Sequence, residues 1–468
     1  MSNYVKIDKD SNNWPGSDRG FNQRFVLDES NIGAGTNKGV YVVTTAQDVV
    51  DALNTANSNH DIIPGDIRVV SGGHCYENFV FENGTTSSKV IVDMSTMSGT
   101  RIEMIEGKKY LVVEPGVGNW DAQHTLFSLF GKALPGGSCY SVCAGGHVSG
   151  GGYGLLSRLH GLTVDYLSGV DIVVNRTGTF ELLKYTPSLM DSVEPNSATP
   201  RDLIWASKGG GGGQFGVITA YYFEFDKLPN SPEYAMYEAA TIPWKDLDSP
   251  ELLRDFINTY RTACLELPLQ GFTLGKLNWN GVDNKGIEHG NDIVILIQVV
   301  YGDSTSHSKA NGGVDVVAID RATAKAAIEK FFSHFENARF LKTTRSGRKG
   351  SVANLAGHPV NAVIPQGEIH DLPWIDVTQA LNGSGDNQNG KYKSANMKES
   401  FTLTEATGLY NFLRTIPESI DPTIVDIDEL KQTIVQIDSY GGQINEMDTV
   451  GNNSNRLCCL IRLEDMAA

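Results

Sequence analysis

The glycine-rich stretch from Gly136 to Gly154 constrains this chain more than any other feature. It reads GGSCYSVCAGGHVSGGGYG, so Cys139 lies in a run of glycines that is too loose for a regular helix or strand. Glycine is used where the backbone takes a positive φ or passes close to a ligand. Upstream, the segment from Arg68 ends in a second glycine turn, Ser-Gly-Gly-His74. Two glycine turns therefore present two nucleophilic side chains.

Neither of the two common nucleotide-binding glycine motifs fits these turns. A Rossmann turn needs G-x-G-x-x-G between a strand and a helix, with an acidic residue about twenty positions later. The sequence from Gly72 to Cys75 lacks this pattern. No G-x-x-x-x-G-K-S/T segment occurs in the chain either, so a P-loop is excluded.

The turns resemble the motifs of the berberine-bridge-enzyme-like branch of the vanillyl-alcohol oxidase superfamily. These flavoproteins carry bicovalent FAD, and the chain is similar to their gluco-oligosaccharide and hexose oxidases. The family's first motif, an arginine followed by Gly-Gly-His, corresponds to Arg68 to His74. The second, G-x-C-x-x-V-x-x-G-G, is Gly137 to Gly146, and the third lies in Asp202 to Gly216. Three motifs in the family's order identify the chain as a member.

This resemblance implies that FAD is attached at two points, with His74 on the flavin 8α-methyl carbon and Cys139 on the flavin C6. Backbone N–H groups of successive glycine turns would hold the pyrophosphate. The adenine end would lie against the backbone near Val217 and Ile218. The remaining expected cofactor-binding residues are Arg68, Ser71, Gly72, Gly73, Ser138, Val142, Ala144, Gly145, Gly146, Gly150 and Gly151.

Ordinary structural roles are the alternative for each attachment residue taken alone. A buried cysteine usually behaves as a small hydrophobe, and a histidine after Gly-Gly is often a satisfied turn residue. The six cysteines show no paired CxxC spacing of a zinc site, so we expect no metal. Cys143 stands where the family usually has glycine, and we assign it no role.

The resemblance also implies an α+β fold with two domains. An FAD-binding domain of the PCMH type, built from two subdomains, is expected over residues 1–227, with its core at about 36–226. A substrate-binding domain, an antiparallel sheet with helices on one face, is expected over 228–450. A length of 468 residues is sufficient for two or three hydrophobic cores.

Periodicity predicts the elements that carry the first domain. Strands are expected at 40–43, 67–70, 90–92, 110–113, 170–174 and 217–223. Thr45 and Asp48 resemble a capping box at the start of a helix whose inward stripe is Val49, Ala52, Leu53 and Ala56. A second helix is expected over 120–130, with Leu126, Leu129 and Phe130 facing inward.

In the second half, Ile293 to Tyr301 is the clearest strand and Ala322 to Phe335 a clear helix. The asparagine- and glycine-rich residues 380–393 are expected to form a mobile surface loop. The five glycines at 209–213 fit either a flexible linker or close packing beside the cofactor, and the flanking Trp205 and Phe215 favour packing.

Family resemblance makes Tyr76 and Tyr153 candidate catalytic residues, because sugar-oxidising members place active-site tyrosines there. Packed aromatic side chains are the alternative. A tyrosine acting as a base at neutral pH would need a stabilised phenolate, since the ordinary pKa is about 10. The segment Gly441 to Met447 resembles the family's substrate-facing strand. Strand alternation would place Gln443 and Asn445, the expected substrate contacts, opposite Ile444 and the third catalytic candidate, Glu446.

The end of the chain departs from the family pattern. Residues 451–468 do not resemble the family's return segment, whose tyrosine often completes the base. We therefore expect an atypical tail, with the coding frame or the record cut short near residue 450 as the favoured explanation. The alternative is a shorter lid in which Tyr76, Tyr153 and Glu446 carry the proton chemistry.

Charge and composition restrict the possible partners. With 38 Lys+Arg against 55 Asp+Glu, the net charge of −17 repels nucleic acid and anionic membranes. No apolar run is long enough to span a membrane. The N-terminus lacks the apolar core of a secretory signal, so a cytoplasmic location is expected, or secretion if a signal was removed.

The leading functional hypothesis is an FAD-dependent oxidase of a carbohydrate alcohol or hemiacetal, with O2 as the electron acceptor. The small Ala144 is expected beside the reactive edge of the flavin, where it would admit O2. One alternative is oxidation of a secondary metabolite such as an alkaloid, a glycosylated polyketide or an aromatic alcohol. A second alternative, from another class, is a flavin-binding protein with impaired catalysis.

Overall fold

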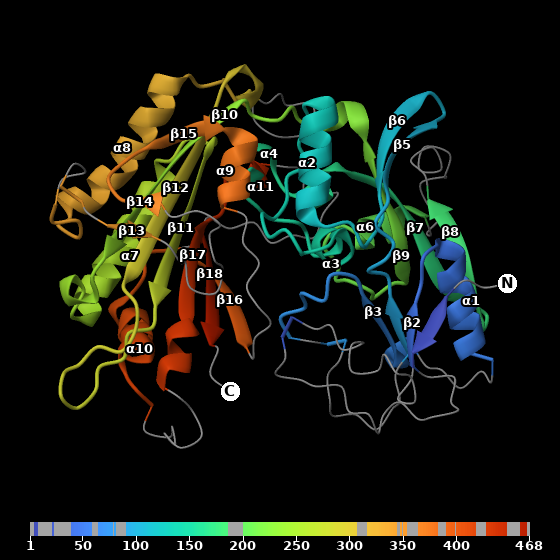
Figure 1. The fold of residues 1–468 in the computed structure, drawn as a ribbon, viewed down its shortest axis with the longest axis horizontal. Coiled ribbons are helices and arrows are strands. Elements are labelled where there is room, and N and C mark those ends of the chain that lie inside the picture. Colours follow the sequence, from blue (N-terminus) through green and yellow to red (C-terminus); the bar gives the residue numbers. More distant parts are fainter. Residues whose placement is uncertain are drawn as a thin grey trace.

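The computed structural model contains two sheets in the N-terminal region (strands β1 to β9) and one large sheet in the C-terminal region (strands β10 to β18) (Figure 1). It describes residues 4–7, 21–22, 39–58, 64–77, 79–80, 90–185, 200–306, 316–343, 347–348, 350–352, 364–381, 390–397, 399–417, 427–446 and 459–465.

The first sheet has the order β1-β2-β4-β3. Its strands are β1 (Val5–Ile7), β2 (Gly39–Val42), β3 (Ile67–Val70) and β4 (Val90–Asp93). Strands β2 and β3 each pair in parallel with β4. Because β2 and β3 run in the same direction, the chain between them must cross back along the sheet, and it does so through helix α1 (Ala46–Ala56). The expected capping box forms: Thr45 accepts from the Asp48 N–H, and Asp48 accepts from the Thr45 N–H. The predicted inward stripe of this helix is buried.

The second sheet is antiparallel, in the order β5-β6-β9-β7-β8. Its strands are β5 (Thr100–Ile105), β6 (Lys108–Val113), β7 (Leu167–Arg176), β8 (Thr179–Tyr185) and β9 (Val217–Glu224). Between β6 and β7 the chain forms the helices α2 (Asn119–Phe130), α3 (Ala144–Ser149) and α4 (Ser157–His160). Helix α6 (Pro200–Ala206) precedes β9.

The large sheet has the order β15-β10-β12-β11-β17-β18-β16, and its paired strands are antiparallel. Its strands are β10 (Tyr234–Ile242), β11 (Gly271–Asn278), β12 (Ile293–Tyr301), β15 (His370–Pro373), β16 (Lys391–Met397), β17 (Ile434–Ser439) and β18 (Cys459–Asp465). A small separate pair is formed by β13 (Ser351–Val352) and β14 (Ile364–Pro365).

Both faces of the large sheet are covered. Helices α7 (Pro250–Leu265), α8 (Arg321–Asn337) and α10 (Leu403–Arg414) pack on one face (Figure 1). Helix α9 (Trp374–Ala380) and parts of the N-terminal region pack on the other. Along β12, Ile293, Ile295 and Ile297 face the helices, and Val294 and Leu296 face the N-terminal region. Burial on both faces explains the unbroken apolar run that predicted this strand.

One expectation about the second half needs correction, and the tail adds a strand. Residues 391–393, expected within a mobile loop, belong to β16, whereas 382–389 lie outside the described residues. The tail contributes β18, which lies between β17 and β16. The adjacent Cys458 and Cys459 and the adjacent Glu464 and Asp465 obscure any alternation of polar and apolar residues, so this segment was not predicted as a strand.

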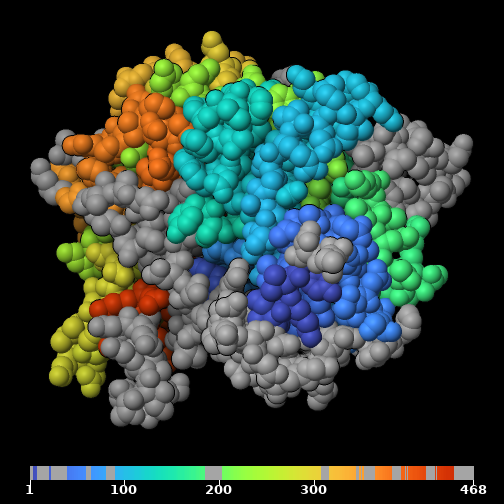
Figure 2. Space-filling view, turned by 45° about the vertical axis from the view of Figure 1, so that its right-hand side comes forward, coloured from blue at the N-terminus to red at the C-terminus, as the bar shows by residue number. Residues whose placement is uncertain are grey.

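Helix α2 forms as expected, but its predicted inward face is partly wrong. Leu126 is buried, whereas Leu129 is 68% exposed and Phe130 is 42% exposed. The helix lies at the surface beside α9 (Figure 2), and the rings of Phe127 and Trp374 are 5.9 Å apart. Its inner side is therefore set by two neighbours, the N-terminal core and α9. Within the described part of the chain, every helix falls short of the length and apolarity required to cross a membrane.

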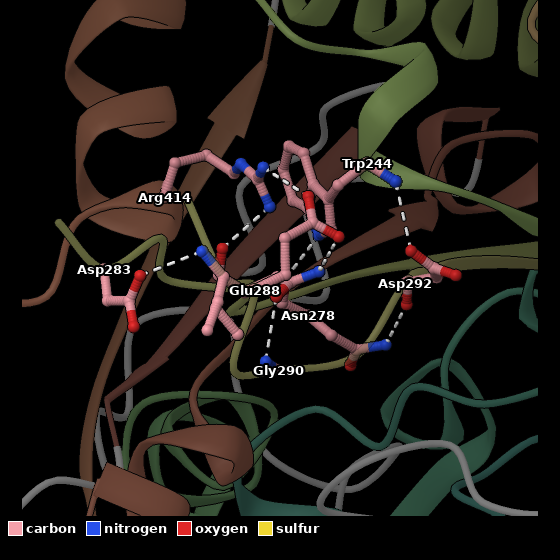
Figure 3. A network of polar contacts seen from close by, with 9 residues as sticks. Trp244, Asn278, Asp283, Glu288, Gly290, Asp292 and Arg414 are labelled. Carbon is pink, nitrogen blue, oxygen red and sulfur yellow. Dashed lines mark hydrogen bonds and ion pairs between the residues drawn. The ribbon is translucent and has the colours of Figure 1, made fainter. Parts of the chain in front are cut away.

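A polar network closes one end of the large sheet (Figure 3). Arg414 donates to Glu288 at 2.6 Å and to the carbonyl oxygen of Asn280 at 2.7 Å. Its guanidinium also lies 5.2 Å from the Trp244 ring centroid. The Trp244 backbone N–H donates to Asp292 Oδ1 at 3.1 Å. These contacts tie α10 to the loop between β11 and β12.

The partly buried Asp292 predicts how stability depends on pH. Burial raises the pKa of its carboxyl, and the hydrogen bond from Trp244 only partly opposes this. A raised pKa means that the neutral form is favoured in the folded state, so stability is lost as the pH rises through that pKa. Asp292→Asn keeps an acceptor for Trp244 and has no charge. We expect its melting temperature to rise above that of wild type between about pH 4 and pH 7. A gain that shrinks over this range would contradict the prediction.

Candidate functional site

The two glycine turns meet in space. Strand β3 ends at Val70 and the chain turns through Gly73, whose φ is 72°. A Cβ placed on Gly72 would lie 2.8 Å from the Ser141 carbonyl oxygen and 2.9 Å from the Cys143 nitrogen. Real Cβ atoms do not approach other atoms so closely, so glycine is required at this contact. The His74 turn and the Cys139 loop are thus packed backbone against backbone.

A side-chain contact joins the same two turns. His74 Nε2 lies 2.8 Å from the Ser141 hydroxyl oxygen, a hydrogen bond whose direction depends on the histidine tautomer. Ser141 is two positions from Cys139, so the structure brings the two predicted attachment loops together. The imidazole ring of His74 also stacks on the ring of Phe21, with centroids 4.7 Å apart. The Phe21 N–H also donates to the Gly73 carbonyl oxygen at 2.7 Å.

The loop that carries Cys139 is held by its own surroundings. The Gly137 N–H donates to His147 Nε2 at 2.8 Å, and Gln123 donates to the Gly137 carbonyl oxygen at 3.0 Å. Farther along, the Asn119 N–H donates to the Val142 carbonyl oxygen at 2.9 Å. His147 lies on α3 and acts here as an acceptor, so this nitrogen carries no proton. Cys139 is half-buried within this fixed loop.

Cys143, which had no assigned role, is the residue that immediately precedes α3. Burial, followed by the charges of Asp121 and Asp93, raises the pKa of its thiol to about 11. Its sulfur donates to the Ser141 carbonyl oxygen at 3.6 Å. Cys143 is therefore a neutral thiol that packs in the contact between the turns.

The glycine run at 209–213 comes close to α3 at one position. Gly209, Gly211 and Gly213 have φ values of 95°, 98° and 72°, which favour glycine. A Cβ on Gly212 would lie 3.1 Å from the Ser149 hydroxyl oxygen of α3. Gly211, Gly212 and Gly213 are exposed, as are Trp205 (44%) and Phe215 (48%), so the close packing that the flanking aromatic residues favoured does not form, and the run is a glycine loop at the surface.

Helix α3 has one crowded side and one open side. A Cβ on Gly145 would lie 2.8 Å from Ser71 Oγ, whereas one on Gly146 would meet no protein atom within 4 Å. Tyr221 donates to the Gly145 carbonyl oxygen at 2.7 Å, and burial raises the pKa of this phenol. The helix thus leaves open space on its Gly146 side.

The other predicted cofactor-binding residues surround these contacts or support them. Arg68 donates to the backbone carbonyl oxygens of Gly65 and Ile67 and, at 3.0 Å, to that of Phe79. Ala144, Val217 and Ile218 are buried, the first on α3 and the others on β9. The remaining members lie next to these in the same loops: Ser138 and Val142, which are half-buried, and Gly150 and Gly151 at the end of α3.

Tyr153 contacts the C-terminal region. Its hydroxyl donates to the Ser439 carbonyl oxygen at the end of β17, at 3.1 Å. Its ring lies 5.0 Å from that of Tyr440 and 6.2 Å from that of Phe272 on β11. Tyr76 also reaches the C-terminal region, because it stacks on Tyr392 of β16. The two tyrosines therefore lie where the glycine loops face the large sheet.

The segment after β17 is not the expected strand. Gly441 and Gly442 have φ values of 98° and 64°, and they turn the chain into a short helix, α11 (Gln443–Glu446). The predicted strand alternation of these side chains is therefore wrong: Gln443 and Ile444 are buried, whereas Asn445 and Glu446 are exposed. The expected pairing of Gln443 with Asn445, and of Ile444 with Glu446, does not hold.

The structure shows buried polar residues that the sequence analysis missed. Asp438 and Lys276 are each 1% exposed, and Gln436 donates to both Asp438 carboxylate oxygens at 2.9 and 3.1 Å. Val435 and Ile437 pack against the helices, so Gln436 and Asp438 face the N-terminal region. Lys276 is paired with Gln436 in the register and is a diagonal neighbour of Asp438. Polar residues alternating with apolar ones in Ile434–Ser439 were the available signal.

Gly72→Ala tests the contact between the two turns. The added Cβ would overlap the Ser141–Cys143 backbone, and overpacking of this kind costs about 1 to 3 kcal/mol. We expect the free energy of unfolding to fall by that amount in urea titrations. Gly65→Ala is the matched control, because a Cβ there meets nothing within 4 Å. Equal stability of the two variants would show that the turns are not in tight contact.

Comparisons with known proteins agree with this geometry. Residues 38–183 match a family model described as an FAD binding domain. A hexose oxidase from Chondrus crispus is 34% identical over 419 residues, covering 88% of this chain and 69% of that protein. Berberine bridge enzyme-like 4 from Arabidopsis thaliana is 35% identical over 170 residues, 35% of this chain and 28% of that protein.

Among solved structures, that of aclacinomycin oxidoreductase superposes with a TM-score of 0.70 at 25% identity, covering 99% of this chain and 81% of that chain. The α+β fold, with its FAD-binding and sheet-bearing parts, is therefore confirmed. The sequence match to hexose oxidase extends well beyond the FAD-binding part, into the C-terminal region. The chain belongs to the berberine-bridge-enzyme-like family of FAD-linked oxidoreductases.

Proposed function

We propose that the protein is an FAD-dependent oxidase of an alcohol or hemiacetal hydroxyl in a carbohydrate. One CH–OH group loses two hydrogens and becomes a carbonyl, and O2 gains them and becomes H2O2. FAD, when bound, supplies the redox chemistry by accepting hydride at N5 and returning the electrons to O2. The similarity to hexose oxidase over 88% of this chain supports a sugar as the substrate.

The contact between the His74 turn and the Cys139 loop is the observation that carries this proposal. Both loops are held by protein contacts, namely the Gly72 packing and the hydrogen bond from Gly137 to His147. Open space beside Gly146 on α3 offers a place where a cofactor can approach the backbone. We further propose covalent attachment through His74 and Cys139, because one planar ring system can reach both loops at their contact.

In this proposal the large sheet supplies the proton chemistry. Asp438 is a buried carboxylate on the face that meets the N-terminal region, and Gln436 orients both of its oxygens. We assign Asp438 the role of general base, which accepts the proton of the substrate hydroxyl. Tyr76 and Tyr153 would orient the substrate, and Ala144 would leave the path to O2 unobstructed. Glu446, with Asn445 beside it, is exposed to solvent, so we place Glu446 second to Asp438 as the base.

A secondary metabolite is the alternative substrate, and the similarity to aclacinomycin oxidoreductase favours it. Both readings predict a flavin that substrate bleaches and air re-oxidises. A flavin-binding protein with impaired catalysis would show neither change. The flavin absorbance therefore separates the classes before the substrate is known.

Anaerobic reduction with a panel of sugars and aromatic alcohols tests the function. We expect a mono- or oligosaccharide to bleach the flavin and air to restore it with one H2O2 per turnover. Asp438→Asn should slow reduction about 100-fold or more, the usual contribution of a positioned base. Glu446→Gln is the matched carboxylate-to-amide control and should stay near the wild-type rate. Reduction by aromatic alcohols alone would favour the alternative substrate, and a flavin that no compound bleaches would defeat the oxidase.

Acid precipitation tests the attachment. His74→Ala and Cys139→Ala should each keep yellow, protein-bound flavin, because one bond remains, whereas the double variant should release it. Cys143→Ala is the control and should keep both bonds, since this neutral thiol only packs in the loop contact. Complete release of flavin from either single variant would refute attachment at two points.

A further inference from the structure

Tyr76 is held from the C-terminal region as well as from its own turn. Its ring stacks on Tyr392 of β16, with centroids 4.1 Å apart and planes 17° apart. Tyr392 is buried, and Tyr76 is half-buried. The stack joins the turn that bears His74 to strand β16, which forms one edge of the large sheet.

The position of the Tyr392 ring is itself fixed by Gly390. A Cβ on Gly390 would lie 2.8 Å from Tyr392 Cε2 and 3.1 Å from its hydroxyl oxygen. The phenol ring therefore lies close against the backbone of Gly390 on one side and contacts Tyr76 through stacking. Only glycine at 390 permits this arrangement of the ring.

Asn22 holds the same backbone in place. Its fully buried side chain donates to the Gly390 carbonyl oxygen at 2.7 Å and accepts from the Gly390 N–H at 3.1 Å. It also donates to the carbonyl oxygen of Tyr76. One amide thus ties the Tyr76 backbone to the strand that carries Tyr392. The neighbouring Phe21 stacks on His74 and lies 6.4 Å from Tyr76, between ring centroids.

From these contacts we infer that Tyr392 is a positioning residue: β16 sets the place of Tyr76 beside His74, and the site is complete only when both regions are docked. The inference rests on the proposed function, in which Tyr76 orients the substrate. Tyr392 is buried behind Tyr76 and acts through it. Neither Tyr392 nor Asn22 was singled out by the sequence analysis.

A double-mutant cycle tests this role. A stacked aromatic pair is worth enough for Tyr392→Leu to slow anaerobic flavin reduction by about five- to tenfold. Tyr392→Phe keeps the stack and should restore the rate. In a Tyr76→Leu background, Tyr392→Leu should cause no further loss, because its effect passes through Tyr76. Tyr234→Leu is the matched control, since it removes one ring of a second stacked pair, Tyr234 and Tyr301, in the same sheet.

A second pair of variants covers the case in which Tyr392→Leu does not fold. Gly390→Ala displaces the Tyr392 ring without removing it, and we expect the same loss of rate. Gly408→Ala on α10 is its control, because a Cβ there meets nothing within 4 Å. Additive effects of Tyr76→Leu and Tyr392→Leu, or a rate for Gly390→Ala equal to that of Gly408→Ala, would overturn the inference.

Hydrogen–deuterium exchange separates this inference from the proposed function. Peptides covering residues 71–77 should exchange at least threefold faster in Tyr392→Leu and Gly390→Ala than in wild type, whether or not a sugar is the substrate. Tyr392→Phe, Tyr234→Leu and Gly408→Ala should match wild type. If no sugar reduces the wild-type flavin but these exchange differences appear, the function fails and the positioning role stands. Unchanged exchange in both destacked variants would reject the positioning role.

Discussion

The backbone contact between Gly72 and the segment Ser141–Cys143 is the constraint on which the site depends. No side chain fits between them, so β3 and α3 must meet with their connecting turns in direct contact. That contact brings His74 to Ser141 and fixes the loop in which Cys139 lies. Hydrogen bonds from Gly137 to His147 and from Asn119 to Val142 hold the loop from the other side. The two side chains that we propose as attachment points are thus positioned by backbone geometry.

The large sheet completes the site from the opposite direction. Its helix-covered face is mostly apolar and carries the buried ion pair of Glu238 with Arg348, and its other face carries the buried Lys276, Gln436 and Asp438. Burying charged groups is costly unless they are paired or hydrogen-bonded, and the cost of this polar cluster supports the role that we propose for Asp438. Tyr153 and Tyr76 meet the same sheet at β17 and β16. The chemistry we propose therefore requires both regions of the chain.

Local sequence was sufficient to predict features that depend on the conformational preference of particular residue types. The glycine turns, the Thr45 capping box and the strand Ile293–Tyr301 were predicted from residues alone, and the family resemblance supplied the fold class. Tertiary context decided the rest. Positive φ at Gly441 and Gly442 converted an expected strand into α11, and contact with α9 changed the inner face of α2. Tyr392 was missed because its partner Tyr76 lies far away in the sequence, and Asp438 because its burial depends on the pairing of β17 with β11 and on the N-terminal region.

A crystal structure of the protein with FAD bound tests the central claim most directly. The account predicts one isoalloxazine ring at the contact of the two glycine turns, with continuous electron density to the His74 ring and to the Cys139 sulfur. The face of the isoalloxazine ring that points away from the glycine turns should lie toward β17, with the Asp438 carboxylate directed toward that ring. A flavin ring located away from the Gly72 contact, or one separated from Asp438 by the body of the sheet, would contradict the account.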